Sequence, residues 1–275
     1  MNDRQIKIIA LDLDGTTLNH RGELTQRTIG AFHRAMEKGV HIVICTGRTF
    51  ASLPDELFSI EGLEYIVTSN GAQITRLADR ETIYENNISA ESVDQIVEIL
   101  EGENYSVEVF VKGNAYIAKE EYEMYLREGS SFRDVNYVLS TRNPIPDFFA
   151  FIRKNRQEIE NINISFPHVE DRGHLMKLLE PVKNVTLTTS FIHNLEIGGA
   201  TTSKADALHF LMHHLKVTSK ELLAVGDSHN DLAMIQLAEI GVVMGNGSEE
   251  MKMYADDIAD DYTNDGAAKI IEKYI

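Results

Sequence analysis

The sequence predicts an α/β fold, with a doubly wound parallel sheet as its core and a smaller α+β domain inserted into it. Two observations predict this class. Apolar strand-like segments alternate with helix-like segments in the first third of the chain and again in the last third, which is typical of a parallel sheet covered by helices on both faces. The middle third mixes helices with antiparallel strand signals, and 275 residues are enough for two hydrophobic cores.

In the first third, three apolar segments are expected to be buried strands, at residues 6–11, 40–45 and 65–68. A helix is predicted between the first two strands. Thr25 can cap its N-terminus, and Gly39 can end it. Its apolar positions recur at helical spacing: Ile29, Phe32 and Met36.

The same alternation resumes near Ser203, which can cap a second amphipathic helix. The apolar positions of that helix are Leu208, Leu211, Met212 and Leu215. Thr218 and Glu221 have the spacing of a capping box. The other elements expected here are strands at 222–225 and 241–244 and a terminal helix at 267–275.

The middle of the chain is predicted to be a separate domain. Residues 107–111 and 115–118 flank Lys-Gly-Asn, which favours a hairpin. Further elements are expected as helices near 147–160 and 170–180, each followed by a strand, at 161–166 and 185–190. We therefore expect a core domain of residues 1–83 and 191–275 and an inserted α+β domain of residues 84–190.

Composition restricts the class of partner. The formal net charge of −17 argues against a nucleic acid or an anionic membrane surface. It does not argue against a small phosphorylated substrate, because a metal ion and basic groups can reverse the field inside one cleft. No apolar segment reaches membrane length, and the single cysteine, Cys45, cannot form an internal disulfide. A cytoplasmic protein, monomeric or weakly homo-oligomeric, is expected.

Acidic residues follow two of the predicted parallel strands: Asp12 and Asp14 follow the first, and Asp227 and Asp231 follow the strand at 222–225. Ligands bind where loops leave the carboxyl ends of such strands. If these carboxylates converge, each close pair repels by about 4 kcal/mol at about 4 Å and an effective dielectric near 20. Mg²⁺, which prefers carboxylates, carbonyls and water, would offset that repulsion. Any one of these acids alone is equally well explained as a turn or helix cap.

Polar groups suited to a phosphoryl group occur at the same strand ends. Thr46 and Gly47 follow the second strand and offer a hydroxyl and backbone N–H groups, although such a pair also suits an ordinary turn. Asn230 lies at a helix start, where it can act as a cap or bind an anion. Lys204 also lies at a helix start, where a lysine is usually solvated and the helix dipole disfavours it. A nearby anion would explain its place.

With these residues in view, the chain resembles the haloacid-dehalogenase-like superfamily of hydrolases, and within it the Cof-type phosphatases. The motifs that carry the resemblance are Asp12-Leu13-Asp14-Gly15-Thr16, Thr46 in Thr-Gly-Arg, Lys204, and Gly226-Asp227-Ser228-His229-Asn230-Asp231, with further matches at 69–72 and 241–246. Three positions depart from the pattern. Thr201 and Ala205 stand where the subfamily usually has glycine, and Thr17 is an additional threonine before Leu18.

The resemblance implies a Rossmann-like core and a cap domain near 84–190 that selects the substrate. It implies a Mg²⁺-dependent phosphatase that hydrolyses a small phosphorylated metabolite, either a sugar phosphate or a phosphorylated cofactor. Asp12 would be the nucleophile that forms an aspartyl phosphate, and Asp14 the general acid and base. The resemblance also implies that the metal ion is bound by Asp12, Asp227 and the backbone carbonyl of Asp14, with Asp231 holding the metal's waters or a ligand in place. The phosphate would be bound by the backbone at Leu13 and by Thr46, Gly47, Lys204 and Asn230.

Two alternatives stay open at this point. A phosphotransferase or phosphomutase of the same superfamily would share the aspartyl-phosphate step but pass the phosphoryl group to a sugar. A non-catalytic metabolite-binding module would keep the scaffold without the reaction. Such a module has no need for both Asp12 and Asp14.

Overall fold

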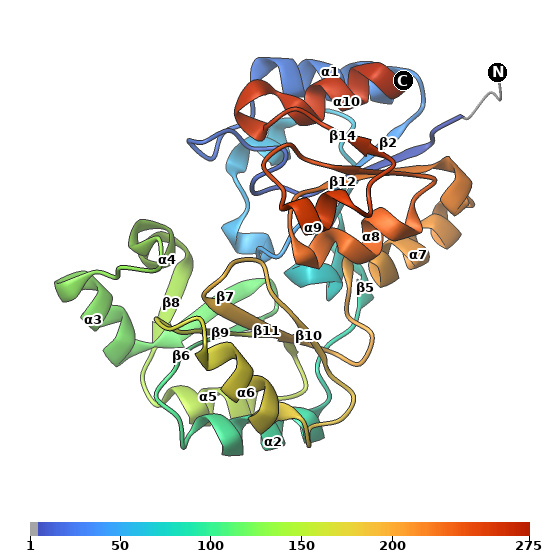
Figure 1. Ribbon diagram of the computed structural model, residues 1–275. Helices are drawn as coiled ribbons and strands as arrows, with labels where there is room; N and C mark the ends of the chain where they lie inside the picture. The colour runs from blue at the N-terminus through green and yellow to red at the C-terminus, as the bar shows by residue number, and fades with distance from the viewer. Residues whose placement is uncertain (1–4) are drawn as a thin grey trace. The chain divides into compact units, whose positions relative to one another are not determined.

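The computed structural model describes residues 5–275, which form two compact units (Figure 1). The first unit contains the described residues up to Gly47, together with residues 53–84 and 203–275. The second unit contains residues 48–52 and 85–202. The predicted class, an α/β fold that contains a parallel sheet and a separate α+β part, is confirmed.

The first unit is built on an eight-stranded sheet with the order β14-β13-β12-β1-β2-β3-β4-β5. The strands are β14 (Asp257–Ile258), β13 (Ile240–Val243), β12 (Leu222–Gly226), β1 (Ile8–Leu11), β2 (His41–Cys45), β3 (Tyr65–Thr68), β4 (Gln73–Arg76) and β5 (Glu81–Glu85). Pairing is parallel from β14 through β3, and β4 pairs antiparallel with β3. Because β1, β3 and β12 are buried along their whole length, they are almost continuously apolar.

Helices cover both faces of this sheet. They are α1 (Gln26–Glu37), α7 (Lys204–Leu215), α8 (Leu232–Leu237), α9 (Glu249–Lys252) and α10 (Gly266–Tyr274). Helices α1 and α10 pack against each other on one side of the sheet (Figure 1). On the other side, α7 and α8 bury Leu208, Leu211 and Met234 in a core with Ala10 and Val43 of the sheet.

The predicted helix boundaries of the first unit are confirmed. The hydroxyl of Thr25 accepts a hydrogen bond from the backbone of Thr28 at the start of α1. The hydroxyl of Ser203 does the same for Asp206 at the start of α7. The capping box of Thr218 and Glu221 is present, but it begins a single 3₁₀ turn at 219–221 and not an α-helix.

The second unit is built on a six-stranded sheet with the order β10-β11-β9-β6-β7-β8. Its strands are β6 (Ser106–Val111), β7 (Asn114–Ala118), β8 (Arg142–Ile145), β9 (Ile159–Ser165), β10 (Thr186–Thr188) and β11 (Asn194–Gly198). Its helices are α2 (Ala90–Leu100), α3 (Lys119–Glu128), α4 (Val135–Thr141), α5 (Phe148–Lys154) and α6 (Asp171–Leu179). Helices α2, α5 and α6 share one apolar core with one face of the sheet. The predicted hairpin is present, with Lys112 and Gly113 both at positive φ in its turn.

Two expectations for this region were wrong. The helix expected at 147–160 ends at Lys154, because residues 159–165 form the central strand β9. The boundary expected at residue 191 lies inside the second unit, because β11 pairs with β9 and the chain returns to the first unit only after Thr202. Residues 48–52 also belong to the second unit, where the backbone N–H of Ala51 donates to the carbonyl of Gly113 at 2.8 Å.

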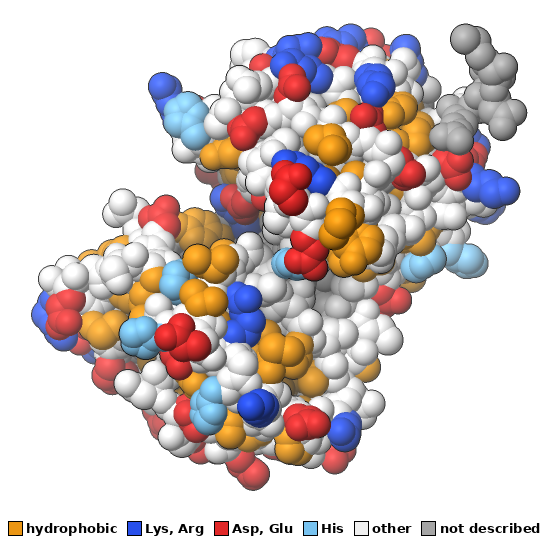
Figure 2. Space-filling model, viewed as in Figure 1, with side chains coloured by type: hydrophobic (Ala, Val, Ile, Leu, Met, Phe, Trp, Pro, Cys, Tyr) orange, Lys and Arg blue, Asp and Glu red, His pale blue; other side chains and the backbone are white. Residues whose placement is uncertain are grey.

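On the face drawn in Figure 2, acidic and basic side chains are interspersed over each unit. Within residues 5–275, no helix is both long enough and apolar enough to cross a lipid bilayer.

Candidate active site

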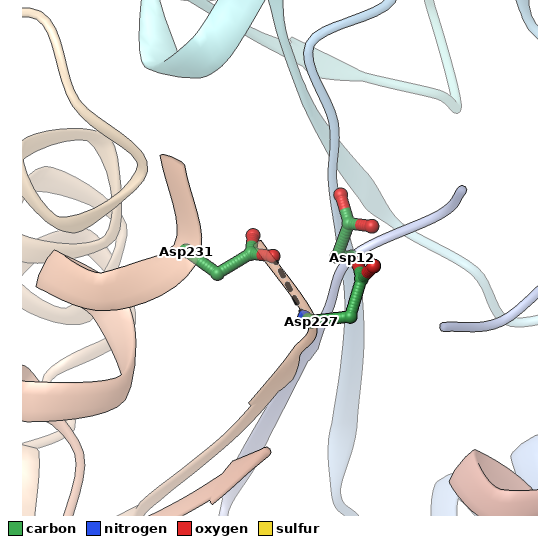
Figure 3. Close-up of side chains that lie close together, drawn as sticks. All are labelled: Asp12, Asp227 and Asp231. Atoms are coloured by element: carbon green, nitrogen blue, oxygen red, sulfur yellow. Dashed lines mark hydrogen bonds between the residues drawn. The ribbon is translucent and has the colours of Figure 1, made fainter. Parts of the chain in front are cut away.

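Three aspartates meet at the carboxyl ends of the neighbouring strands β1 and β12 (Figure 3). Asp12 directly follows β1, Asp227 directly follows β12, and Asp231 ends the 3₁₀ turn at 229–231. Each offers one carboxylate oxygen, and these oxygens lie within 4.8 Å of one another. The structure therefore brings together three of the four acids that the sequence placed at strand ends.

Lys204 lies among these acids with no exposed surface. Its Nζ is 2.5 Å from Oδ1 of Asp12 and 2.6 Å from Oδ1 of Asp231. Burial lowers the pKa of Lys204, but Asp12 and Asp231 outweigh burial and raise the pKa above its ordinary value. The lysine is therefore a buried cation, and two carboxylates explain why it tolerates the start of α7.

A close backbone approach sets the position of Lys204. Gly71 follows β3 with φ +96°, and a Cβ at this residue would lie 2.1 Å from the carbonyl oxygen of Ser203. Only glycine combines this left-handed backbone with such a short approach. The loop after β3 therefore packs directly on the first turn of α7, the turn that carries Lys204.

Asp231 is the most completely hydrogen-bonded of the three acids. Its Oδ2 accepts from the backbone N–H groups of Asp227 at 3.0 Å and Ser228 at 3.1 Å, and its Oδ1 accepts from Lys204. The bond to Asp227 is the dashed line in Figure 3. With both oxygens engaged, Asp231 fixes the loop after β12 and the lysine together.

The acids are held at an energetic cost. Burial raises the pKa of Asp12 well above its ordinary value, and the charge of Asp231 raises it further. Burial and then Asp231 also raise the pKa of Asp227, to about 7. A divalent cation would offset this repulsion, and the carboxylate oxygens of the cluster are ligands of the type that Mg²⁺ prefers. Among residues 5–275, this is the group of side chains with metal-site geometry.

Asp14 lies outside the buried cluster, with an exposed side chain. The turn that carries it depends on Gly15, whose φ is +74° and whose Cβ would lie 2.6 Å from Oδ2 of Asp227. Asn246 connects this turn to the loop that follows β12. Its Nδ2 donates a hydrogen bond to the carbonyl of Gly15 at 2.9 Å and lies 3.4 Å from Oδ2 of Asp227. The sequence of the segment at 241–246 predicts no role for Asn246.

A second side of the site contains Thr46, Gly47 and Asn230. Thr46 is buried directly after β2, and its carbonyl accepts from the backbone of Asn70 at 3.0 Å. The side-chain Oδ1 of Asn70 accepts from Nδ2 of Asn230 at 3.0 Å. A Cβ at Gly47 would lie 3.0 Å from the same Oδ1. Asn70 therefore connects the two loops expected to bind phosphate.

Asn70 contacts both loops of the candidate site, a position that the sequence did not predict. It and Ser69 adopt positive φ, 57° and 51°, which is unusual for residues other than glycine and often marks a functional loop. The available signal was the Ser-Asn-Gly segment directly after the strand at 65–68. Of the other predicted residues, Leu13 is fully buried after β1 and its carbonyl accepts from the backbone of Thr17.

Thr201 and Ala205, which stand where the related phosphatases usually have glycine, lie in different units. Ala205 is the second residue of α7. Thr201 belongs to the second unit, where its Oγ1 accepts a hydrogen bond from Nδ2 of Asn86 at 2.9 Å.

Comparison with known proteins gives consistent matches along the chain. Residues 9–271 match the model of the family described as haloacid dehalogenase-like hydrolase. The chain is 28% identical to phosphatase YwpJ of Bacillus subtilis, over 94% of this chain and 96% of that protein. It is also 28% identical to the 5-amino-6-(5-phospho-D-ribitylamino)uracil phosphatase YcsE of the same organism, over 99% and 97%.

A solved structure, a haloacid dehalogenase-like hydrolase from B. subtilis, superimposes with a TM-score of 0.83 at 28% identity. That alignment covers 98% of this chain and 100% of the other.

Proposed function

The chain belongs to the haloacid dehalogenase-like hydrolase family, and we propose that it uses Asp12 as a nucleophile and Mg²⁺ as a cofactor. Its reaction class is that of a phosphatase that acts on phosphorylated small molecules. The observation that carries the proposal is the buried cluster in which Lys204 contacts Asp12 and Asp231 while Asp227 lies alongside. Asp12, Asp231 and Lys204 are buried and Asp227 is half-buried, and like charges gathered in this way destabilise a fold unless a further positive charge compensates them.

The donor atoms of the cluster suit a hard divalent cation. Asp12 and Asp227, with the backbone carbonyl of Asp14, would hold it, and Asp231 would keep Lys204 and the loop after β12 in place. When bound, the ion offsets the charge of the carboxylates and of the substrate phosphate.

Phosphoryl transfer begins on Asp12. Lys204 binds Oδ1 of this carboxylate and thereby fixes its orientation. A carboxylate oxygen attacks phosphorus, the bond from phosphorus to the ester oxygen breaks, and an aspartyl phosphate forms. Asp14 gives its proton to the departing oxygen, which leaves as an alcohol. The exposure of Asp14 is consistent with contact to substrate and to water.

Hydrolysis reverses the protonation of Asp14. The carboxylate takes a proton from water, the water oxygen attacks phosphorus, and the bond from phosphorus to Asp12 breaks. Inorganic phosphate leaves, and both aspartates return to their starting state. During both transfers, Lys204 and the loops joined by Asn70 would bind the phosphoryl oxygens, with Thr46, Gly47, Asn230 and the backbone at Leu13 as donors.

The second unit is proposed to act as a cap that selects the substrate, either a sugar phosphate or a phosphorylated cofactor. It supplies a sheet and five helices of its own and is inserted between the segments that carry the catalytic loops. Unlike the catalytic cluster, it can therefore change in sequence without altering the reaction chemistry.

Release of inorganic phosphate tests the proposal. We expect wild-type protein to release phosphate from at least one phosphomonoester with Mg²⁺, and to stop when a chelator is added. The Asp12→Asn variant should keep its fold by circular dichroism and lose turnover by at least about a thousandfold. Full activity of that variant would exclude Asp12 as the nucleophile.

A further inference from the structure

Asn246 lies beside the candidate site, in the loop that follows β13. Strand β13 pairs parallel with β12, and the backbone N–H of Met244 extends this pairing with a hydrogen bond of 3.0 Å to the carbonyl of Gly226. The loop after β13 therefore leaves the sheet at the same edge as the loop that carries Asp227. The side chain of Asn246 is exposed, so it is not needed to fill the core.

The backbone next to Asn246 is closely packed. A Cβ at Gly247 would lie 2.7 Å from Cγ1 of Val243 and 3.1 Å from the carbonyl oxygen of Asp227. The backbone N–H of Gly247 also donates to the carbonyl of Met244 at 2.9 Å. The loop itself therefore fixes the backbone from which the Asn246 side chain extends.

Two backbone groups determine the orientation of the Asn246 amide. Its Oδ1 accepts from the N–H of Tyr262 at 3.2 Å, and its Nδ2 donates to the carbonyl of Gly15 at 2.9 Å. A backbone N–H can only donate and a carbonyl can only accept, so exchanging the amide oxygen and nitrogen would break both bonds. The donor end of the side chain therefore faces the turn that contains Gly15.

The same nitrogen also contacts the acidic cluster. Nδ2 of Asn246 carries two hydrogens, and it lies 3.4 Å from Oδ2 of Asp227. Gly15 approaches this oxygen as well, because a Cβ at Gly15 would lie 2.6 Å from it. One amide nitrogen therefore contacts both the turn that carries Asp14 and the carboxylate of Asp227.

Other hydrogen bonds of the turn do not replace this contact. The backbone N–H of Thr17 donates to the carbonyl of Leu13 at 3.0 Å. These residues are close in the chain, so their bond shapes the turn but does not place it relative to the loop after β12. The hydroxyl of Thr16 reaches Oδ1 of Asp227, but at 3.4 Å, which is longer than the 2.9 Å bond from Asn246 to the turn.

We propose that Asn246 is a positioning residue, which holds the turn of Asp14 at a fixed separation from Asp227. The inference rests on the proposed phosphatase function, in which the side chain of Asp14 transfers protons and its carbonyl joins Asp227 in holding Mg²⁺. Both tasks depend on where Asp14 lies relative to Asp227, and the amide nitrogen of Asn246 contacts the two segments that carry them. Asn246 takes no part in the chemistry itself.

The bond from Tyr262 to Oδ1 allows a purely structural role, in which the amide only holds the loop of Tyr262. Removal of the amide would then lower stability without weakening the ion site, and its effect on turnover would add to that of Asp14→Asn. A positioning role gives the opposite pattern. The ion site weakens, and the effect on turnover disappears once Asp14 has lost its function.

Mg²⁺ affinity tests the positioning role without turnover. Calorimetry measures the dissociation constant of Mg²⁺ for wild type and for Asn246→Ala, and melting temperatures establish that both proteins fold. We expect about tenfold weaker binding, the lower end of the usual effect of losing a group that orients a metal ligand. Asn264→Ala is the matched control, because Asn264 is exposed in the 3₁₀ turn that begins at Tyr262. This control should bind Mg²⁺ as wild type does.

A double-mutant cycle tests whether Asn246 acts through Asp14. We expect Asn246→Ala to lower kcat by about tenfold in the otherwise wild-type chain, and by less than about twofold in Asp14→Asn protein. A tenfold loss in both backgrounds would show that the amide acts independently of Asp14 and would overturn the inference.

The two measurements also separate the inference from the proposed function. Weaker Mg²⁺ binding by Asn246→Ala supports the positioning role even if wild-type protein releases no phosphate, a result that would refute the phosphatase mechanism alone. Unchanged Mg²⁺ affinity of that variant, in a protein that does release phosphate, would overturn the positioning role and leave the mechanism intact. Wild-type protein that binds no Mg²⁺ would refute both.

Discussion

The ammonium group of Lys204 lies 2.5 Å from Oδ1 of Asp12, although the two residues are separated by 192 positions in the chain. The parallel pairing of β1 with β12 places the loop after β1 beside the loop after β12. The start of α7 reaches the same site because it packs on the loop after β3 at Gly71. The same contact makes the site dependent on charge balance. Removing the cation leaves Asp12 and Asp231 buried together without compensation.

The first prediction concerns this balance. We expect Lys204→Met to destabilise the protein by about 3–5 kcal/mol, the usual cost of removing one partner from a buried ion pair. Urea unfolding followed by circular dichroism measures the loss. Mg²⁺ should recover more stability in this variant than in wild type, because the ion then supplies the only local positive charge. If the variant is as stable as wild type, the ion pairs of Lys204 with Asp12 and Asp231 do not stabilise the fold.

The second prediction distinguishes the catalytic role of Asp14 from that of Asp12. Asp14→Asn should still allow Asp12 to become phosphorylated, because the nucleophile and its lysine are unchanged, but more slowly, because the departing oxygen no longer receives a proton from Asp14. Loss of the base should slow hydrolysis by about 10²–10⁴-fold, so phosphorylated protein should accumulate. Rapid-quench mass spectrometry of the intact protein detects the added phosphoryl group. Wild-type turnover without accumulation would rule out the acid and base role.

The third prediction is a pH dependence in the second unit. Burial raises the pKa of Glu108, but Arg142 and Arg133 outweigh burial and lower the pKa to about 2. An unfolded glutamate has a pKa of about 4.3. Because the folded pKa is the lower one, the stabilisation is complete above about pH 4.3 and is lost as the pH falls towards 2.

Glu108→Gln should therefore lower the free energy of unfolding of the second unit at pH 7 by about 3 kcal/mol, the equivalent of this difference in pKa. It should also flatten the dependence of that free energy on pH between about 4 and 2. Hydrogen exchange of amides in β6 and β9 follows this unit separately. An equally steep acid transition in the variant would show that another group is responsible.

The sequence predicted the site better than it predicted the loops that support it. Asp12 and Asp227 were placed correctly at strand ends because parallel strands deliver the loops at their carboxyl ends to one edge. Asn70 and Asn246 were missed because their roles arise from side-chain contacts between loops that are far apart in the chain. No periodicity within one segment reports such contacts.

In the second unit, prediction from the sequence failed for a different reason. The strand at 194–198 was missed because it is short and contains asparagine, glutamate and glycine, residues that are uncommon in strands. It is stable here because β9 and β10 pair with its two edges. Such pairing depends on tertiary structure, and it also explains why the domain boundary was expected too early.

The last prediction concerns the contact that positions Lys204. Gly71→Ala would introduce a Cβ 2.1 Å from the carbonyl oxygen of Ser203 at a φ of +96°. We expect a loss of about 2–4 kcal/mol, because backbone strain adds to overpacking. Gly22→Ala is the matched control: its φ is +75°, but its Cβ would meet nothing within 4 Å. The control should lose only about 1 kcal/mol, the cost of the left-handed backbone alone.

The phosphatase activity of the two glycine variants should differ in the same direction as their stability. Displacing the first turn of α7 moves Lys204 away from Asp12, so kcat should fall by about tenfold or more in Gly71→Ala, whereas Gly22→Ala should keep wild-type kcat at a temperature where both proteins are folded. Urea unfolding and steady-state phosphate release measure the two effects. If both variants lose the same stability and neither loses activity, the approach of Gly71 to Ser203 does not control the position of the lysine.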